Sequence, residues 1–251
     1  MFSRRSILSY VAASYALSTT RALSKQCAIT ESDCPKPCRI TQEDWFKERC
    51  DIKIPKRKFE FAPQEMSNWC WAACIQAAML LKNYHVTQDK IVRKVFSDGR
   101  NEEATLLQLE RLLAIRTHWV DANGKCFSVT SDAIFDAFLE PGRIYDLNKS
   151  DGSKTVYESL DLDWPVIISV SDNLLTSYVG GHAVLLLKAS FNVKMKNGER
   201  QNLFFAFDPI QNNTWPNGIR TLTPQEVQTT RFALGIQVWQ PLRRTGCYFA
   251  I

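Results

Sequence analysis

Hydrophobic residues recur every three to four positions in the part of the chain that follows residue 59, and this spacing predicts helices. The first helix is expected over residues 68–81, where Ser67 or Asn68 can cap its start and several alanines, with Ile75 and Met79, supply an apolar face. The same spacing predicts further helices over residues 91–96, 106–115 and 131–139, the last with Ser131 as its cap.

The hydrophobic pattern changes beyond residue 165. Four runs there are short, apolar and rich in β-branched or aromatic residues, which predicts strands over residues 166–170, 183–187, 203–207 and 233–239. Because the helices come first and the strands afterwards, the chain is expected to fold as an α+β domain over residues 59–251. In that domain a helical part packs on an antiparallel β-sheet.

The first 24 residues have the pattern of a targeting signal. Arg4 and Arg5 precede an apolar run at residues 7–17, and small residues at 22–24 suit cleavage. We interpret residues 1–24 as an export signal peptide, with an amphipathic first helix of the fold as the alternative. The paired arginines fit a twin-arginine signal or the positive region of a general secretory signal. The mature protein is then expected to be secreted or periplasmic, without stable membrane insertion, because the apolar run is too short to span a bilayer comfortably.

Residues 25–58 form a polar extension with too few apolar residues for a core of their own. Four of the eight cysteines lie in it: Cys27, Cys34, Cys38 and Cys50. These cysteines lack the close pairs of common zinc sites and have no histidine nearby, so disulfide bonds in an oxidising compartment are favoured over a metal. A propeptide, an inhibitory segment and a surface extension are all compatible with this composition.

The charge of the chain excludes one class of partner. Without the three arginines of residues 1–24, the 31 basic side chains become 28, against 26 acidic ones. No stripe of lysine and arginine with interleaved aromatic residues is present, so we do not expect a nucleic-acid partner.

The segment from Gln64 to Cys74 carries the clearest chemical signal. Cys70 falls in the first turn of the predicted helix, where unpaired N–H groups and the helix dipole lower the pKa of a thiol and make it nucleophilic. Gln64, six residues earlier, can bring its amide beside the helix start. Together with the backbone N–H of Cys70 it would form an oxyanion hole.

The general base for such a thiol must be a histidine, and the chain has three. His182 follows two glycines and opens a predicted strand, a rigid position with open backbone before it. His85 and His118 have no comparable position, so His182 is the predicted base.

An acidic residue is expected to orient this histidine and stabilise its charged form. Asp208 closes the predicted strand 203–207 and precedes Pro209. Asp172, at the end of the preceding strand, is the alternative. Neighbouring antiparallel strands would bring His182 and Asp208 to the same region of the sheet.

Three segments carry a resemblance to a known family: Trp69-Cys70-Trp71-Ala72-Ala73-Cys74, Gly181-His182-Ala183-Val184 and Asp208-Pro209. Over about residues 59–240 the chain resembles the bacterial papain-like cysteine proteases, which include bacteriocin-leader peptidases and plant-pathogen effector proteases. The resemblance implies a papain-like fold, with Cys70 as nucleophile, Gln64 in the oxyanion hole, and His182 with Asp208 completing the triad. The cysteine-rich extension and the charged stretch 188–201 depart from the family and leave the substrate open.

The positions of the remaining cysteines indicate different roles for them. Cys74 lies one helical turn after Cys70 and is expected to be a buried, unpaired residue. Cys126 and Cys247 could form a bridge, although the sequence does not establish connectivity. Trp69 and Trp71 are expected to serve packing.

These features together predict an exported cysteine peptidase that acts on a polypeptide through a Cys70 acyl-enzyme and needs neither metal nor organic cofactor. An acyltransferase or deamidase would use the same triad. A non-catalytic exported binding protein on the same fold is the alternative from another class.

Overall fold

The computed structural model describes residues 50–53, 61–114, 117–136, 147, 150–170, 181–210, 217–228, 230 and 232–239. The chain divides into two compact units, Met1–Arg39 and Ile40–Ile251, and every described residue belongs to the larger one. The predicted signal peptide and the cysteines at 27, 34, 38 and 247 therefore lie outside the described residues, as does Asp172.

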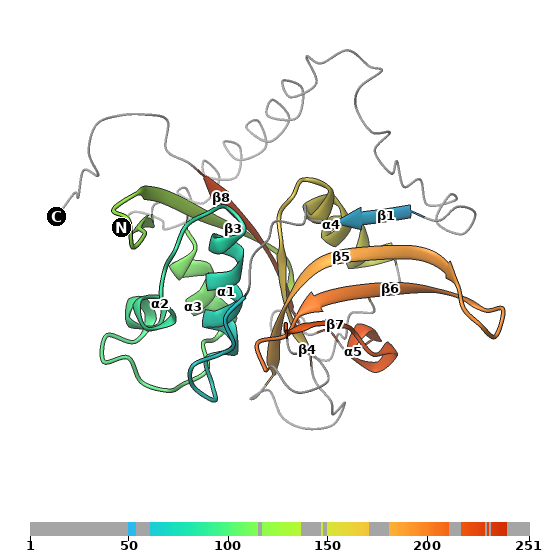
Figure 1. Ribbon diagram of the computed structural model, residues 1–251, viewed down its shortest axis with the longest axis horizontal. Helices are drawn as coiled ribbons and strands as arrows, with labels where there is room; N and C mark the ends of the chain where they lie inside the picture. Colours follow the sequence, from blue (N-terminus) through green and yellow to red (C-terminus); the bar gives the residue numbers. More distant parts are fainter. Residues whose placement is uncertain are drawn as a thin grey trace, which may run out of the picture. The chain divides into compact units, whose positions relative to one another are not determined.

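The described part of the larger unit contains helices and an eight-stranded antiparallel sheet, which confirms the predicted α+β class. The helices are α1 (Cys70–Leu80), α2 (Gln88–Val95), α3 (Leu106–Leu112), α4 (Ser150–Asp161) and α5 (Pro224–Gln228). The strands are β1 (Cys50–Lys53), β2 (His118–Val120), β3 (Cys126–Asp136), β4 (Val166–Val170), β5 (His182–Lys194), β6 (Arg200–Phe207), β7 (Ile219–Thr221) and β8 (Phe232–Trp239). Figure 1 shows α1, α2 and α3 grouped beside the sheet, and β5 and β6 as a long hairpin.

The strand order in the sheet is β2-β3-β8-β4-β5-β6-β7, and β1 pairs with the outer half of β5. All pairings are antiparallel. Strand β4 is buried along its whole length, and it lies between β5 and β8. This central position explains its continuous apolar sequence, since both faces of the strand are covered.

Helix α1 is the central helix of the domain. It packs against β5 and also contacts β4 and β8. Nine of its eleven residues are buried, and Ile75, Met79 and Cys74 are fully so. Because the helix is buried on nearly every side, the position of its first residue is rigidly fixed.

Capping residues account for the starts of two helices. Thr87 accepts a hydrogen bond from the backbone N–H of Lys90 at the start of α2. Thr105 and Gln108 form a capping box at the start of α3. The caps proposed for α1 were wrong: its N-cap residue is Trp69, and no side chain caps the helix.

The helix predicted over residues 131–139 was also wrong. Residues 131–136 belong to β3, which pairs with β8 from Ser128 opposite Trp239 to Asp136 opposite Phe232. Phe127 and Val129 are buried on alternate positions of the same strand. Because β8 supplies the backbone partners of this segment, its local helical spacing does not decide its structure. Residues 137–139 lie outside the described residues.

Part of the predicted extension 25–58 belongs to the main sheet. Residues Cys50–Lys53 form β1, which pairs with β5 from Cys50 opposite Phe191 to Lys53 opposite Lys188. The stretch 188–201 is correspondingly not a loop, since β5 continues through it to Lys194 and β6 begins at Arg200. The turn between them includes Gly198 at a φ of +86°, a conformation that glycine adopts without strain.

Candidate active site

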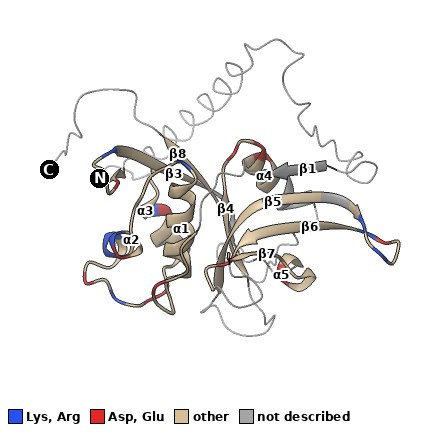
Figure 2. Cartoon of the chain, in the orientation of Figure 1, with Lys and Arg blue, Asp and Glu red and all other residues tan. Residues whose placement is uncertain are grey.

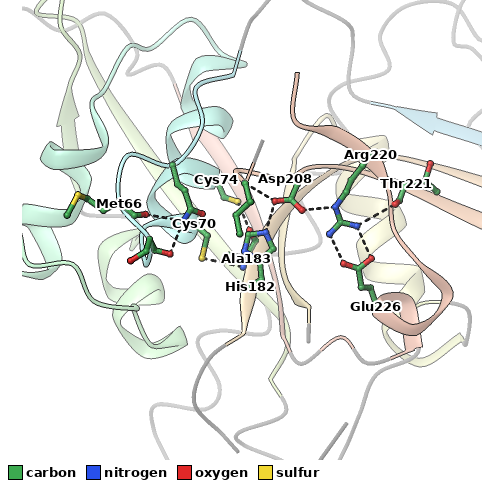
Figure 3. A network of polar contacts seen from close by, with 12 residues as sticks. Met66, Cys70, Cys74, His182, Ala183, Asp208, Arg220, Thr221 and Glu226 are labelled. Atoms are coloured by element: carbon green, nitrogen blue, oxygen red, sulfur yellow. Dashed lines mark hydrogen bonds and ion pairs between the residues drawn. The ribbon is translucent and has the colours of Figure 1, made fainter. Parts of the chain in front are cut away.

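Cys70 is the first residue of α1. Its side chain faces β5, where the backbone N–H of Ala183 donates a hydrogen bond to its Sγ atom at 3.5 Å (Figure 3). The residue is 7% exposed. The N–H groups at a helix start have no partner within the helix, and the helix dipole places positive partial charge there. The sulfur atom therefore faces positive partial charge from both the helix and the strand.

His182 is the first residue of β5 and lies between Cys70 and Asp208 (Figure 3). Its Nε2–H donates a hydrogen bond to Oδ1 of Asp208 at 2.6 Å. The Cys70 side chain lies close enough to the imidazole to help raise the pKa of His182. Since Nε2 is engaged by the carboxylate, Nδ1 is the ring nitrogen left for the thiol.

Charge interactions determine the protonation of this histidine. Burial by itself lowers the pKa of His182, but the hydrogen bonds to Asp208 and Cys70 and the negative charges of these groups outweigh it and raise the pKa to about 9. The imidazole is therefore positively charged at neutral pH in this arrangement.

Asp208 follows directly after β6 and is 3% exposed. Besides the bond from His182, its Oδ1 accepts the backbone N–H of Ile210 at 2.9 Å, and its Oδ2 accepts Nε–H of Arg220 at 2.6 Å. Burial alone would raise the pKa of Asp208. The hydrogen bonds from His182 and Arg220, with the positive charge of His182, lower it instead, so the carboxylate stays ionised.

Two glycines allow the backbone to approach these residues closely. A Cβ atom on Gly181, just before His182, would lie 2.1 Å from the Oγ atom of Ser169 in β4. Gly218 has a φ of +68°, and its carbonyl accepts the backbone N–H of Asp208 at 2.6 Å. A Cβ atom on Gly218 would lie 2.8 Å from the carbonyl oxygen of Asp208 and from the ring of Phe207.

Arg220 and Glu226, which were not predicted from the sequence, extend the network beyond Asp208 (Figure 3). Arg220, in β7, donates from Nη1 and Nη2 to the two carboxylate oxygens of Glu226 at 2.8 and 2.5 Å. Glu226, in α5, also accepts the backbone N–H of Thr223 at 2.7 Å. The Thr-x-x-Glu spacing with Pro224 between them is a helix-start signal that could have identified Glu226. Nothing in the local sequence indicates that Arg220 faces inward.

Gln64 lies in the loop before α1. Its Nε2 donates to the carbonyl oxygens of Met66 and Ser67 at 3.0 and 2.8 Å, and its backbone N–H donates to the carbonyl of Pro209 at 3.1 Å. The residue thus connects the loop before Cys70 to the turn after Asp208. Both amide hydrogens have carbonyl partners within this loop, so a role in an oxyanion hole would require one of these bonds to be exchanged.

The loop that carries the nucleophile is held by a second loop, residues 98–102. Asn68 and Asn101 form paired hydrogen bonds, each 3.0 Å long. The indole N–H groups of Trp69 and Trp71 donate to the carbonyls of Arg100 and Glu102, both at 3.2 Å. Since both indoles are buried, this agrees with the packing role predicted for them.

The other two histidines are not at this site. His85 and His118 are both exposed, His85 after the end of α1 and His118 at the start of β2. His118 contacts the hydroxyl of Ser128 in β3 through Nδ1 at 3.3 Å.

Cys74 is a free thiol and is fully buried, as predicted. Its thiol donates to the carbonyl oxygen of Ala183 at 3.5 Å. Burial, followed by the negative charges of Cys70 and Asp208, raises the pKa of Cys74 well above its usual value, so this thiol stays protonated. Cys126 is disulfide-bonded, and the suggested partner, Cys247, lies outside the described residues.

The described residues offer no group of three or more His, Cys, Asp or Glu side chains arranged to hold a metal ion. Within the same residues, no helix combines the length and the apolar character needed to cross a bilayer. Lysine and arginine are interspersed with acidic residues, for example around the turn of the β5–β6 hairpin (Figure 2).

Cys70, His182 and Asp208 thus form a connected series of side chains, and Gln64 lies in the adjoining loop. Arg220 and Glu226 continue the series on the side away from Cys70. No protein-family model matches the chain, and no curated protein sequence matches it.

Proposed function

We propose that this protein is a papain-like cysteine hydrolase that cleaves peptide bonds, with Cys70 as nucleophile, His182 as general base and acid, and Asp208 as the residue that orients His182. The observation that carries the proposal is the uninterrupted contact series from a thiol at a helix start, through an imidazole, to a buried carboxylate. A helix bearing the cysteine and packed on an antiparallel sheet bearing the histidine supports the papain-like form of this fold.

Acylation begins with a thiolate at Cys70 beside a protonated His182. The thiolate attacks the carbonyl carbon of the substrate, forming a C–S bond and an oxyanion. His182 then transfers its proton to the leaving nitrogen as the C–N bond breaks, and the acyl-enzyme remains. A pKa of about 9 suits His182 for holding this proton until the leaving group needs it.

The oxyanion needs hydrogen-bond donors at the start of α1. The backbone N–H of Cys70 is one candidate, because the first N–H groups of a helix have no partner within it. The Nε2–H group of Gln64 is the second, provided that it exchanges its bond to Met66 or Ser67 for one to the substrate. Its position between the Cys70 loop and the Asp208 turn supports this assignment.

Deacylation repeats these steps with water. His182, now neutral, removes a proton from water, and the resulting attack breaks the C–S bond and restores the thiolate and imidazolium pair. If an amine takes the place of water the same site is an acyltransferase, and if the substrate is a side-chain amide it is a deamidase. The machinery of the described residues is the same for all three.

The protein is further proposed to be exported, on the pattern of residues 1–24 and the cysteine-rich composition of residues 25–58. In that case the polypeptide substrate is met in the periplasm or outside the cell.

Turnover of a defined peptide mixture by the mature protein tests the proposal. The wild type is expected to generate new amino termini, and Cys70→Ala is expected to lose at least about 10³-fold in rate because the nucleophile is gone. Cys74→Ala is the matched control, since it removes a thiol from the same helix one turn away and is expected to retain most of the activity. Mass spectrometry of the products separates cleavage from amide transfer and deamidation.

Equal turnover by the wild type and Cys70→Ala would remove the proposed role of Cys70. No turnover by the wild type would instead favour a non-catalytic exported binding protein with this fold.

A further inference from the structure

We propose that Arg220 and Glu226 are positioning residues of the candidate active site, which hold the Asp208 carboxylate in the orientation that His182 requires. This inference rests on the proposed function for its catalytic meaning, but the geometry that supports it is independent of the substrate.

The three side chains form a buried ionic series. Asp208, Arg220 and Glu226 are 3%, 8% and 6% exposed. Arg220 uses Nε for Asp208 and its two terminal nitrogens for Glu226, at distances of 2.5 to 2.8 Å. A planar guanidinium fixes the angle between the two carboxylates, which a flexible ammonium group does not.

Each end of the series is held by the backbone. Glu226 accepts the N–H of Thr223 and is part of α5, and its own backbone N–H donates to the hydroxyl of Thr223 at 3.2 Å. Asp208 accepts the N–H of Ile210, and its backbone N–H donates to the carbonyl of Gly218. The orientation of Arg220 is therefore set by a helix start and is transmitted to Asp208.

The division of oxygen atoms at Asp208 explains why the orientation matters. Arg220 occupies Oδ2, while Oδ1 accepts the N–H group of His182. With Oδ2 fixed, the carboxylate cannot rotate to offer the wrong oxygen or plane to the imidazole. A displacement of about 1 Å at a catalytic group can cost roughly 10²-fold in rate.

Several charged or titratable side chains among the described residues act on this series. Asp208 interacts with His182 from β5, with Arg220 from β7 and with the Cys74 thiol from α1, while Cys70 acts on His182. The guanidinium of Arg220 faces the carboxylates of Asp208 and Glu226, and its Nη1 also donates to the carbonyl of Thr221 at 3.5 Å. A substitution that conserves charge at Arg220 or Glu226 therefore changes the geometry of the series while its formal charges stay the same.

The test uses Arg220→Lys and Glu226→Asp. Both variants keep the charge but disrupt the hydrogen bonds between the guanidinium and the two carboxylates, because lysine lacks the planar donors and aspartate is one methylene shorter. Titration of protein labelled with ¹⁵N-histidine reports His182 directly, and only three histidines have to be assigned. We expect the pKa of His182 to fall from about 9 by roughly one unit in each variant, a tenfold loss of proton affinity.

Kinetics supply the second measurement. The rate constant kcat is expected to fall about 10- to 100-fold while KM stays within about twofold, since a misplaced carboxylate affects the transition state rather than substrate binding. Arg93→Lys is the matched control, because it makes the same change in an exposed arginine–carboxylate pair with Asp89 on α2. It should leave both measurements unchanged.

Melting curves identify any variant that does not fold. If Arg220→Lys or Glu226→Asp fails to fold, the remaining variant tests the positioning role. An unchanged His182 titration in the folded variants overturns the positioning role, even if the protein proves to be a peptidase. Conversely, a lowered His182 pKa in a protein without peptidase activity supports the positioning role while the proposed function fails.

Discussion

The imidazole of His182 and the carboxylate of Asp208 meet at 2.6 Å across two adjacent antiparallel strands, β5 and β6. The register explains the meeting. Leu185 pairs with Phe207, and continuing that register places Asp208 beside Val184. Positions 182 and 184 face the same side of the sheet, so Asp208 becomes the diagonal neighbour of His182. The contact thus follows from the strand pairing, and the packing of α1 on β5 brings Cys70 to the same region.

This ion pair predicts a pH dependence of stability. The pKa of His182 rises from 6.5 to about 9 on folding, so the folded protein holds a proton that the unfolded chain releases earlier. The stabilisation is complete below pH 6.5 and is lost as the pH rises through about 9. In urea denaturation the free energy of unfolding should fall by about 1 to 3 kcal/mol across this window.

Asp208→Asn should remove most of that slope, because the neutral amide no longer stabilises the imidazolium. His118→Gln is the control, since His118 is exposed and its imidazole contacts the hydroxyl of Ser128 rather than a carboxylate. A wild-type stability that is constant or rises between pH 6.5 and 9 would show that His182 does not have the raised pKa.

Substitutions of two glutamines distinguish a role of Gln64 in stabilising the oxyanion from a role in supporting the loop before α1. Gln64→Ala should lower kcat about 10²-fold, because one donor to the oxyanion is lost. Gln88→Ala weakens the same loop from another direction, since Gln88 bonds to the backbone of Pro63 and Glu65. It should cost about 1 to 3 kcal/mol of stability with little effect on kcat. Equal losses of kcat in both variants would leave Gln64 with a structural role only.

Substitutions of two glycines test whether the close approach of Gly218 positions Asp208. Gly218→Ala and Gly124→Ala both place a side chain at a positive φ, +68° and +76°, which costs about 1 to 2 kcal/mol. Only at Gly218 does the new Cβ atom meet Asp208 and Phe207, whereas nothing lies within 4 Å at Gly124. Peptidase activity per folded molecule should therefore fall in Gly218→Ala and persist in Gly124→Ala. Full activity of folded Gly218→Ala would mean that the Asp208 turn adjusts without consequence.

The elements that form the candidate site could be predicted from the sequence because their signals are local. The alanine-rich run after Cys70 and the apolar runs of β4 and β5 are long enough to define a helix and two strands. A chain with three histidines leaves few choices for a base. Cys70, His182 and Asp208 each lie at an element boundary, where sequence patterns place functional residues well.

The parts that could not be predicted depend on tertiary pairing. Residues 131–136 have helical spacing but form a strand because β8 pairs with them. The contact of the Ala183 N–H with Cys70 depends on how α1 packs on β5, which no local pattern encodes. Arg220 resembles an ordinary surface arginine in the sequence, and its role emerges only from the two carboxylates around it.

The central claim is that Cys70 is an activated nucleophile paired with His182, and alkylation tests it most directly. The folded protein is treated with iodoacetamide across a pH series, and the modified cysteine is mapped by mass spectrometry. Ordinary thiols ionise near pH 8.5 and lose about tenfold in reactivity for each unit below it. Cys74, fully buried with a raised pKa, is the internal reference and should react only after denaturation.

We predict that Cys70 is labelled first, that its reactivity persists at mildly acidic pH, and that His182→Ala abolishes this acid-range reactivity. The contrary result would be a Cys70 that stays unlabelled in the folded protein, or one whose reactivity declines with falling pH like that of an ordinary thiol and is the same in wild type and His182→Ala.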